Sequence, residues 1–178
     1  MNERLPMSSE TVEPPATRRP LEPLVSQLAS SLMLPPGGKT QTDVWATPQW
    51  LFDALDKEFG FTLDPCCDAT NAKCSTFFTE DDNGLLKEWG TESVFMNPPY
   101  SECEAWMLKG YKAAQNGATV VCLVPVRSDT NWWHRYAMKG EIRFLRGRLK
   151  FGEAVDPAPF PSAVIVFRPW EFRLVSVG

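Results

Sequence analysis

The sequence lacks most of the short motifs that mark phosphate-binding and membrane proteins. Its 178 residues contain neither the Gly-x-Gly-x-x-Gly turn nor a Walker loop, so there is no dedicated cradle for a pyrophosphate. No apolar run approaches the roughly 20 residues of a membrane-spanning helix. The N-terminus carries charged residues and prolines where a secretory signal needs an apolar stretch. We therefore expect a cytoplasmic protein without a membrane segment.

Metal ligands and disulfide patterns are also scarce. The sequence has one histidine and five cysteines, an odd number, and two of the cysteines are adjacent. A zinc site built from Cys66, Cys67, Cys74 and His134 is the alternative to reduced thiols, but the paired Cys-x-x-Cys spacing typical of zinc sites does not occur. We expect reduced thiols and no bound metal.

The sequence predicts two regions of different character. Residues 1–42 hold seven of the sixteen prolines and no sustained apolar period, which is typical of a flexible leader. The rest of the chain carries most of the tryptophans and the strongly apolar stretches. We expect residues 43–178 to form a single domain around one core.

Strands and helices are predicted to alternate along this domain. Thr47 and Pro48 suit the N-cap and the first position of a helix that ends at Gly60, and Ser101 with Glu104 forms a capping-box pattern for a helix that ends near Gly117. A short helix is expected over 131–139. Strands are expected over 61–63, 75–79, 94–96, 118–124, 141–145 and 162–167. The alternation predicts an α/β fold with a mostly parallel sheet, helices on both faces and an antiparallel closing strand.

Polar segments follow three of the predicted strands. Asp64-Pro65 follows the first, Glu80-Asp81-Asp82 the second and Asn97-Pro98-Pro99-Tyr100 the third. Because the carboxyl ends of parallel strands meet at one edge of a sheet, we expect the three segments to line one cleft. Carboxylates at strand ends accept hydrogen bonds from ribose hydroxyls. With no phosphate cradle, a nucleoside cofactor without phosphates fits best, and S-adenosylmethionine is such a cofactor.

The third segment has the chemistry to activate an amine. The side-chain oxygen of Asn97 and the carbonyl of Pro98 are two acceptors that could take the hydrogens of an exocyclic amine on a base and localise its lone pair. The ring of Tyr100 could stack on that base once it is flipped out or single-stranded. The alternative is a proline-rich turn without a catalytic role.

Positive charge is concentrated in one part of an otherwise acidic chain. The net charge is −4, yet residues 105–150 hold nine basic and two acidic residues, whereas residues 43–104 hold three basic and thirteen acidic ones. We expect the basic part to contact the phosphates of a nucleic acid, although a solvated charged surface is the alternative. The candidate contacts are Arg127, Arg143, Arg146, Arg148 and Lys150. The loops 127–133 and 146–161 are expected to set a short or loose sequence preference.

Several of these segments together resemble the phage-type DNA N6-adenine methyltransferases. The resemblance rests on Trp45 with Thr47-Pro48, on 63–66, on 71–74, on the turn 82–85 with Trp89, and on 97–101, and it spans about residues 43–170. It implies the Rossmann-like class I fold of S-adenosylmethionine-dependent methyltransferases. It also implies that the first two strand-end segments and the Thr-Pro segment bind the cofactor. The residues concerned are Trp45, Thr47, Pro48, Asp64, Pro65, Cys66, Glu80 and Asp82.

The resemblance implies a catalytic role for Asn97, Pro98, Pro99 and Tyr100. Which carboxylate of 80–82 meets the ribose is open, and Asp64-Pro65-Cys66-Cys67 stands where many methyltransferases have a glycine-rich loop. The function expected from the sequence is methyl transfer from S-adenosylmethionine to adenine in DNA. The alternatives are an RNA or protein-amide methyltransferase, or a non-catalytic module that senses a nucleoside or binds DNA.

Overall fold

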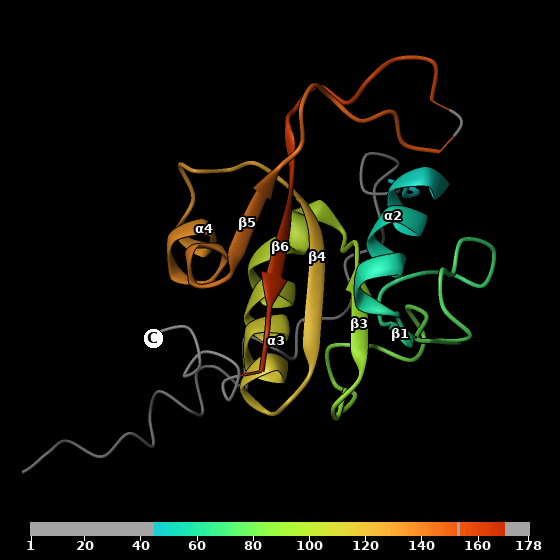
Figure 1. Cartoon of the computed structure of the whole chain (residues 1–178), viewed down its shortest axis with the longest axis vertical. Helices are drawn as coiled ribbons and strands as arrows, with labels where there is room; N and C mark the ends of the chain where they lie inside the picture. The colour runs from blue at the N-terminus through green and yellow to red at the C-terminus, as the bar shows by residue number, and fades with distance from the viewer. Residues whose placement is uncertain (1–44, 153, 170–178) are drawn as a thin grey trace, which may run out of the picture. The chain divides into compact units, whose positions relative to one another are not determined.

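One six-stranded sheet organises the described part of the chain (Figure 1). The computed structural model describes residues 45–152 and 154–169, which belong to the compact unit Gly38–Gly178. The predicted leader therefore lies outside the described residues. The strand order is β2-β1-β3-β4-β6-β5. The strands are β1 (Leu63–Asp64), β2 (Thr76–Phe77), β3 (Ser93–Met96), β4 (Thr119–Pro125), β5 (Glu141–Phe144) and β6 (Ser162–Phe167).

The strand directions agree with the predicted α/β sheet. The pairs β1–β2, β1–β3 and β3–β4 are parallel, whereas β6 runs antiparallel to both β4 and β5. The register places Val94 opposite Val120, and Val120 opposite Phe167. The carboxyl ends of β1, β3 and β4 consequently meet at one edge of the sheet.

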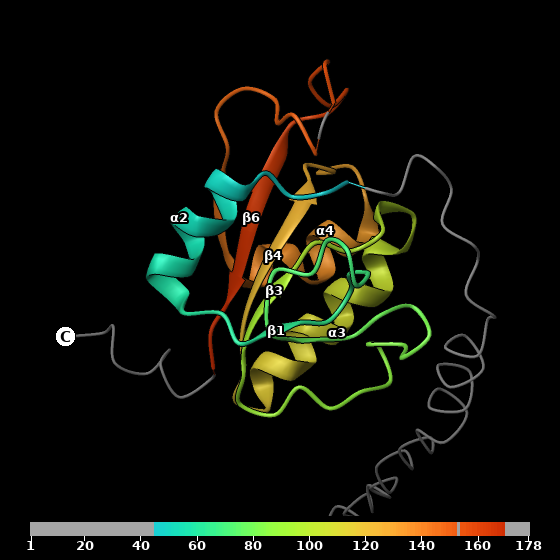
Figure 2. The ribbon, with the colours of Figure 1, turned by 90° about the vertical axis from the view of Figure 1, so that its right-hand side faces the viewer.

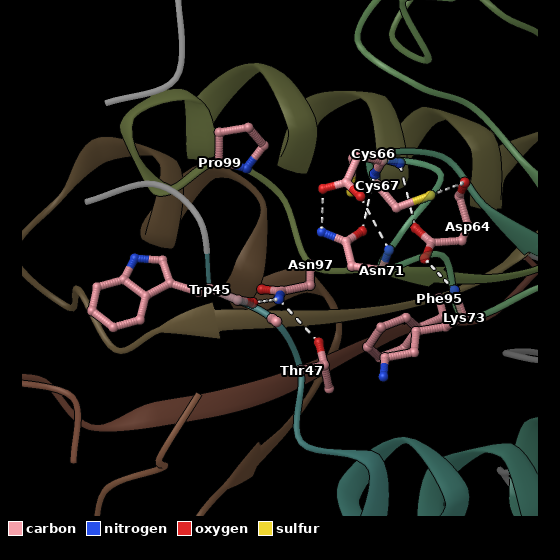
Figure 3. Close-up of a pocket in the computed structure, with 12 residues that line it drawn as sticks. Trp45, Thr47, Asp64, Cys66, Cys67, Asn71, Lys73, Phe95, Asn97 and Pro99 are labelled. Atoms are coloured by element: carbon pink, nitrogen blue, oxygen red, sulfur yellow. Dashed lines mark hydrogen bonds between the residues drawn. The ribbon is translucent and has the colours of Figure 1, made fainter. Parts of the chain in front are cut away.

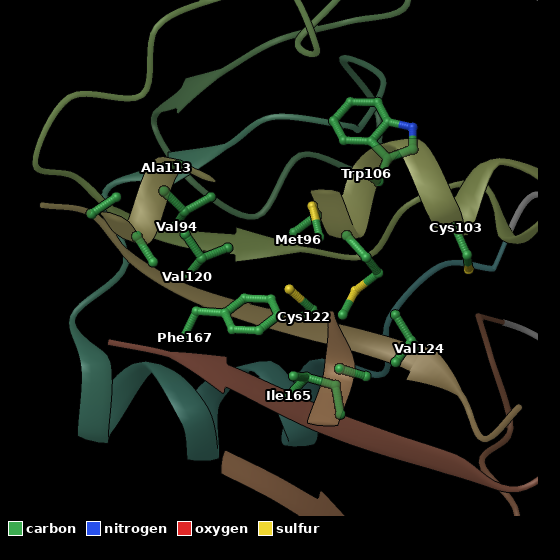
Figure 4. Close-up of a cluster of buried hydrophobic side chains, with 14 of the residues drawn as sticks. Val94, Met96, Cys103, Trp106, Ala113, Val120, Cys122, Val124, Ile165 and Phe167 are labelled. Atoms are coloured by element: carbon green, nitrogen blue, oxygen red, sulfur yellow. The ribbon is translucent and has the colours of Figure 1, made fainter. Parts of the chain in front are cut away.

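Helices cover both faces of the sheet (Figure 2). The side chains of β4 alternate between the two faces. Helix α2 (Gln49–Phe59) packs on Val121 and Leu123, while α3 (Cys103–Gln115) and α4 (Asn131–Arg135) pack on the face of Val120 and Cys122. Figure 4 shows the second of these clusters, with Met96 and Ile165 beneath α3. Because β4 is buried on both faces, its continuous apolar sequence is the expected one.

The starts of two helices differ from the prediction. Pro48, not Thr47, is the N-cap of α2, and no side chain caps that helix. Ser101 does not begin α3, because a 3-10 turn, η1 (Tyr100–Glu102), forms first, with the Glu102 amide donating to the Pro99 carbonyl at 3.0 Å. The 3-10 turn therefore follows the two prolines directly, and α3 starts at Cys103.

Three predicted elements are shorter than expected. The Phe61 amide donates to the Asp56 carboxylate at 2.7 Å beyond the end of α2, so β1 begins only at Leu63 and includes Asp64. The second predicted strand is reduced to Thr76–Phe77. The helix expected over 131–139 divides into α4 and a 3-10 turn, η2 (Ala137–Lys139).

The remaining chemistry of the described residues is simple. All five cysteines are free thiols. Across 45–152 and 154–169, no group of three or more His, Cys, Asp or Glu side chains is placed to hold a metal ion. Nor does any helix within those ranges combine the length and the hydropathy that crossing a bilayer requires.

Candidate active site

A pocket opens at the carboxyl edge of the sheet, where β1 and β3 end beneath the segment that leads into α2 (Figure 3). Residues 45–47 form one wall, the loop after β1 forms another, and the end of β3 forms the floor. The lining residues are Trp45, Ala46, Thr47, Asp64, Cys66, Cys67, Asp68, Asn71, Lys73, Phe95, Asn97 and Pro99. Two of the three predicted strand-end segments therefore meet at one pocket.

Asp64 holds the shape of the loop after β1. Its side chain is 3% exposed, and its carboxylate accepts hydrogen bonds from the main-chain amides of Lys73 at 3.1 Å and Cys66 at 3.5 Å. Burial raises the pKa of Asp64 above its ordinary value, while the two amides act in the opposite direction. The carboxylate thus ties the two ends of the loop 66–73 together at the pocket wall.

Three residues of that loop line the pocket although the sequence did not single them out as site residues. Asp68 and Asn71 hold each other: the Asn71 amide nitrogen donates to the Asp68 carboxylate at 2.6 Å, and the Asp68 main-chain amide donates to the Asn71 side-chain oxygen at 2.9 Å. Lys73 brings an ammonium group that donates to Gln49 at 2.8 Å. The available signal was their place within or beside the segment 71–74, one of those that carry the family resemblance.

Asn97 has an amide whose two ends differ. Its nitrogen donates to the main-chain oxygen of Trp45 and to the hydroxyl of Thr47, the latter at 3.0 Å (Figure 3). Its side-chain oxygen is buried and has no hydrogen-bond partner among the described residues. Because the carbonyl of Trp45 can only accept, the nitrogen must face it, and this assigns the orientation of the amide. The site therefore presents one fixed, unused acceptor.

Tyr100 belongs to a group of four aromatic rings rather than to the pocket wall. Its ring lies nearly parallel to that of Trp45, with 6.2 Å between the centroids, and edge-on to Phe151 and Phe160 at 6.3 and 5.4 Å. We call Trp45, Tyr100, Phe151 and Phe160 the aromatic group. Burial raises the pKa of Tyr100, and its hydroxyl is buried without a hydrogen-bond partner in the described ranges. The phenol is thus neutral at physiological pH.

The loop 146–161 is attached to the pocket through the same segment. The Gly152 amide donates to the Ala46 carbonyl at 2.8 Å, and Phe151 and Phe160 each contact Trp45 edge-on, with 5.2 Å between centroids. Leu149, Phe151 and Ala158 are buried in the core beneath α2. The loop that the sequence predicts to set the sequence preference is therefore packed against the wall of the site.

The acidic turn does not line this pocket, in contrast to the prediction that all three strand ends share one cleft. Asp82 is exposed, and its carboxylate accepts hydrogen bonds from the Thr79 amide and hydroxyl at 2.9 and 2.8 Å, which lower its pKa. The turn does touch the loop after β1, because Gly84 lies against the Pro65 carbonyl so closely that a Cβ there would overlap it. Glu80 is likewise absent from the pocket wall.

The predicted DNA contacts separate into two kinds. Arg143 is committed to two carboxylates, those of Glu58 at 2.6 and 2.7 Å and of Glu141 at 2.6 Å, and lies over the Phe59 ring. The other predicted contacts are exposed and form no ion pair within the described residues. They are Arg127, Arg146, Arg148 and Lys150, of which we call the last three the basic segment. Of the five predicted contacts, these four keep their charge available to a polyanion, as far as ion pairs within the described residues show.

Trp132 and Trp133 pack in the core. They are 8% and 4% exposed and join the cluster beneath α3 and α4. Their burial favours core packing over stacking on a base. The ring of Phe144 stacks on Trp133 at 6.5 Å yet is 68% exposed, next to the basic segment.

Taken together, the pocket supplies an acceptor of fixed direction, an ammonium group and carboxylates. Comparisons with known proteins agree with this chemistry. The family model described as DNA N-6-adenine-methyltransferase (Dam) matches residues 37–177. The chain is 30% identical to the DNA N-6-adenine-methyltransferase of Haemophilus phage HP1, over 74% of this chain and 82% of that protein. It is 24% identical to the enzyme of the same name from Escherichia phage T1, over 71% of this chain and 63% of that protein.

Proposed function

Because the chain belongs to the DNA N-6-adenine-methyltransferase (Dam) family, we infer that it is an enzyme that methylates the N6 amine of adenine in DNA. One observation supports the assignment of the reacting centre: the Asn97 side-chain oxygen is buried, fixed in direction and unpaired within the described ranges. An unpaired buried acceptor is costly and rare in proteins, and an amine hydrogen of the substrate would satisfy it.

The fold supports the same proposal at a coarser level. The mixed sheet with four parallel strands and helices on both faces is compatible with the Rossmann-like class I methyltransferase fold, with the site at the carboxyl edge. We propose that residues 43–178 form this single methyltransferase domain.

S-adenosylmethionine is the proposed methyl donor, and the pocket residues fit it. This cofactor has an amino-acid end that carries a carboxylate and an ammonium group, together with a positively charged sulfur. Lys73 provides a cation for the carboxylate, while Asp68 provides a carboxylate for a positive group, and both line the pocket with Thr47 and Cys66. When bound, the cofactor supplies an electrophilic methyl group. Glu80 and Asp82 remain proposed contacts to its adenosine from outside this pocket, beside the Pro65 carbonyl that Gly84 touches.

The reacting residues act on the amine of the adenine. The Asn97 oxygen accepts one amine hydrogen, and the Pro98 carbonyl accepts the other, so that the nitrogen lone pair withdraws from the ring and becomes a nucleophile. With S-adenosylmethionine held by the pocket residues, this lone pair would accept its methyl group, and the electrons of the methyl–sulfur bond would stay with the sulfur. The methylated nitrogen is positively charged and strongly acidic, and it releases a proton to restore the neutral amine. These steps do not require a side chain that acts as a general base.

Access to the base requires that the adenine leave the DNA stack. We propose that Tyr100 packs against the flipped base, with Pro99 in the pocket wall beside it. Arg127 and the basic segment then contact phosphates of the DNA around it, because their charges are exposed and unpaired in the described residues. Arg143 is left out of this set because Glu58 and Glu141 neutralise it.

The test is to identify the methylated product. The protein is incubated with S-adenosylmethionine labelled in the methyl group and with DNA, RNA or protein, and each acceptor is then digested and analysed. N6-methyladenine from DNA is the expected product. Label found only in RNA or in protein would contradict the proposed substrate, and cofactor binding without any labelled acceptor would indicate a sensing or binding module. Asn97→Ala serves as the control for the reacting centre, and it should abolish most of the label.

A further inference from the structure

The contacts of the Asn97 amide assign a task to Thr47 that is separate from binding the cofactor. A carboxamide nitrogen has two hydrogens, and both are used here, one by the Trp45 carbonyl and one by the Thr47 hydroxyl. Rotating the amide by half a turn would break the bond to Trp45 and set the Asn97 oxygen against the Trp45 carbonyl, whereas the Thr47 hydroxyl could turn and donate to that oxygen. The Trp45 carbonyl therefore decides which end of the amide faces the substrate, and the Thr47 hydroxyl helps to hold the amide in that position.

Thr47 is placed for this task by its neighbours in the sequence. The residue before a proline is driven to an extended conformation, so Thr47 cannot enter the helix that starts after Pro48. No side chain caps α2, so the Thr47 hydroxyl is left for the Asn97 amide 3.0 Å away. Its side chain is buried, at 6% exposed, and so it is shielded from competing water.

The segment that carries Thr47 is itself fixed from the other side. Ala46 accepts the Gly152 amide, and Trp45 is enclosed by Tyr100, Phe151 and Phe160. The Trp45 contact to Asn97 comes from the main chain and does not depend on the side chain at that position, whereas the Thr47 contact comes from a side chain. Of the two partners of the Asn97 nitrogen among the described residues, Thr47 is thus the one whose contact a side-chain substitution can remove.

We propose that Thr47 is a positioning residue, which holds the Asn97 amide so that its oxygen faces the adenine amine. The inference rests on the proposed function only for its effect on the rate. Loss of the hydroxyl frees one Asn97 hydrogen and leaves the amide held by the Trp45 carbonyl alone, so that its oxygen is held less firmly toward the amine. A misplaced reacting group lowers the turnover number while leaving the affinity for either substrate nearly unchanged.

The experiment compares Thr47→Val, which removes the hydroxyl but keeps the branched shape, with Thr47→Ser, which keeps the hydroxyl. At saturating DNA and S-adenosylmethionine, Thr47→Val should lower kcat by about tenfold or more, and Thr47→Ser should stay within about threefold of the parent. Thr62→Val is the control, because Thr62 also loses a hydroxyl contact, to the Ser93 main chain, at the opposite end of β3. This control should keep the parental kcat.

A second measurement needs neither DNA nor cofactor. In nitrogen-15 spectra, the Asn97 side-chain signals are assigned by their disappearance in Asn97→Asp, and hydrogen exchange of that amide is followed. Exchange should be about tenfold faster in Thr47→Val than in the parent. Unchanged exchange would overturn the proposal, as would equal losses of kcat in both Thr47 variants or a loss confined to cofactor affinity. If the parental protein makes no N6-methyladenine, the proposed function fails, while the exchange result still decides the role of Thr47.

Discussion

Asn97→Ala separates catalysis from stability, because one end of this amide stabilises the fold and the other does not. Substitution removes two donated hydrogen bonds, to Trp45 and Thr47, each worth about 0.5–1.5 kcal/mol. It also removes a buried oxygen with no partner in the described residues, whose desolvation costs about 1–3 kcal/mol. The two effects nearly cancel, so the free energy of unfolding should change by less than about 2 kcal/mol.

Asn71→Ala is the matched control for that magnitude. Both ends of the Asn71 amide are paired with Asp68, one of them in a charge-assisted bond of 2.6 Å, so no unpaired oxygen is relieved. Its loss should lower the free energy of unfolding by about 2–4 kcal/mol, more than Asn97→Ala does.

The assay pairs urea denaturation with single-turnover methylation of DNA. Asn97→Ala should methylate at least about a hundredfold more slowly than the parent, as expected when a group that stabilises the transition state is deleted. Cofactor affinity should change little. The reasoning is refuted if Asn97→Ala methylates within tenfold of the parent, or if it destabilises the protein as much as Asn71→Ala, since the oxygen would then be paired in solution.

Three further predictions concern the surroundings of the site. Replacing the three residues of the basic segment by alanine should weaken DNA binding. In fluorescence titrations at several salt concentrations, the slope of log affinity against log salt should fall by roughly one unit for each cation removed. An unchanged slope would exclude phosphate contact by these residues. Arg143→Ala should leave DNA affinity unchanged and lower stability near neutral pH. Arg143 lowers the pKa of Glu58 and of Glu141. The ion pairs therefore contribute to the free energy of unfolding above about pH 4.5, the ordinary pKa of a glutamate, and this contribution is lost as the pH falls through the lowered pKa. The difference between parent and variant in thermal melts should therefore shrink in acid, and a difference that grows there would contradict the ion-pair account. Gly84→Ala should destabilise the protein by about 1–3 kcal/mol in urea and weaken cofactor binding, because its Cβ would overlap the Pro65 carbonyl; parental behaviour would show that the turn does not brace the loop after β1.

Local sequence patterns predicted most of the sheet. The apolar run of β4 and the proline stop after β3 are properties of neighbouring residues, and both elements formed where expected. The starts of helices were less predictable. Thr47 has the chemistry of an N-cap, but Pro48 keeps it extended and Asn97, fifty residues away, takes its hydroxyl. A capping pattern cannot reveal a competitor so distant in the chain.

The candidate site shows the same division. Asn97-Pro98-Pro99-Tyr100 was recognisable from sequence because proline restrictions and amide chemistry are local. The sequence also located the basic stretch, but it could not show that Arg143 pairs with Glu58, 85 residues apart in the chain, because ion pairs depend on where a helix and an edge strand meet. Nor could it show that Phe151 and Phe160 enclose Trp45.

The sequence by itself thus determined the α/β pattern, the family and the amide proposed to react, since each rests on residue types and on spacings along the chain. Only the tertiary structure decided which end of the Asn97 amide is free, because that depends on the Trp45 carbonyl, which the fold brings from the start of the domain to the end of β3. The tertiary structure also showed that the acidic turn lies outside the pocket and that Lys73 lines it. The sequence pattern could not predict where these loops lie, because β1 and β2 are only two residues long.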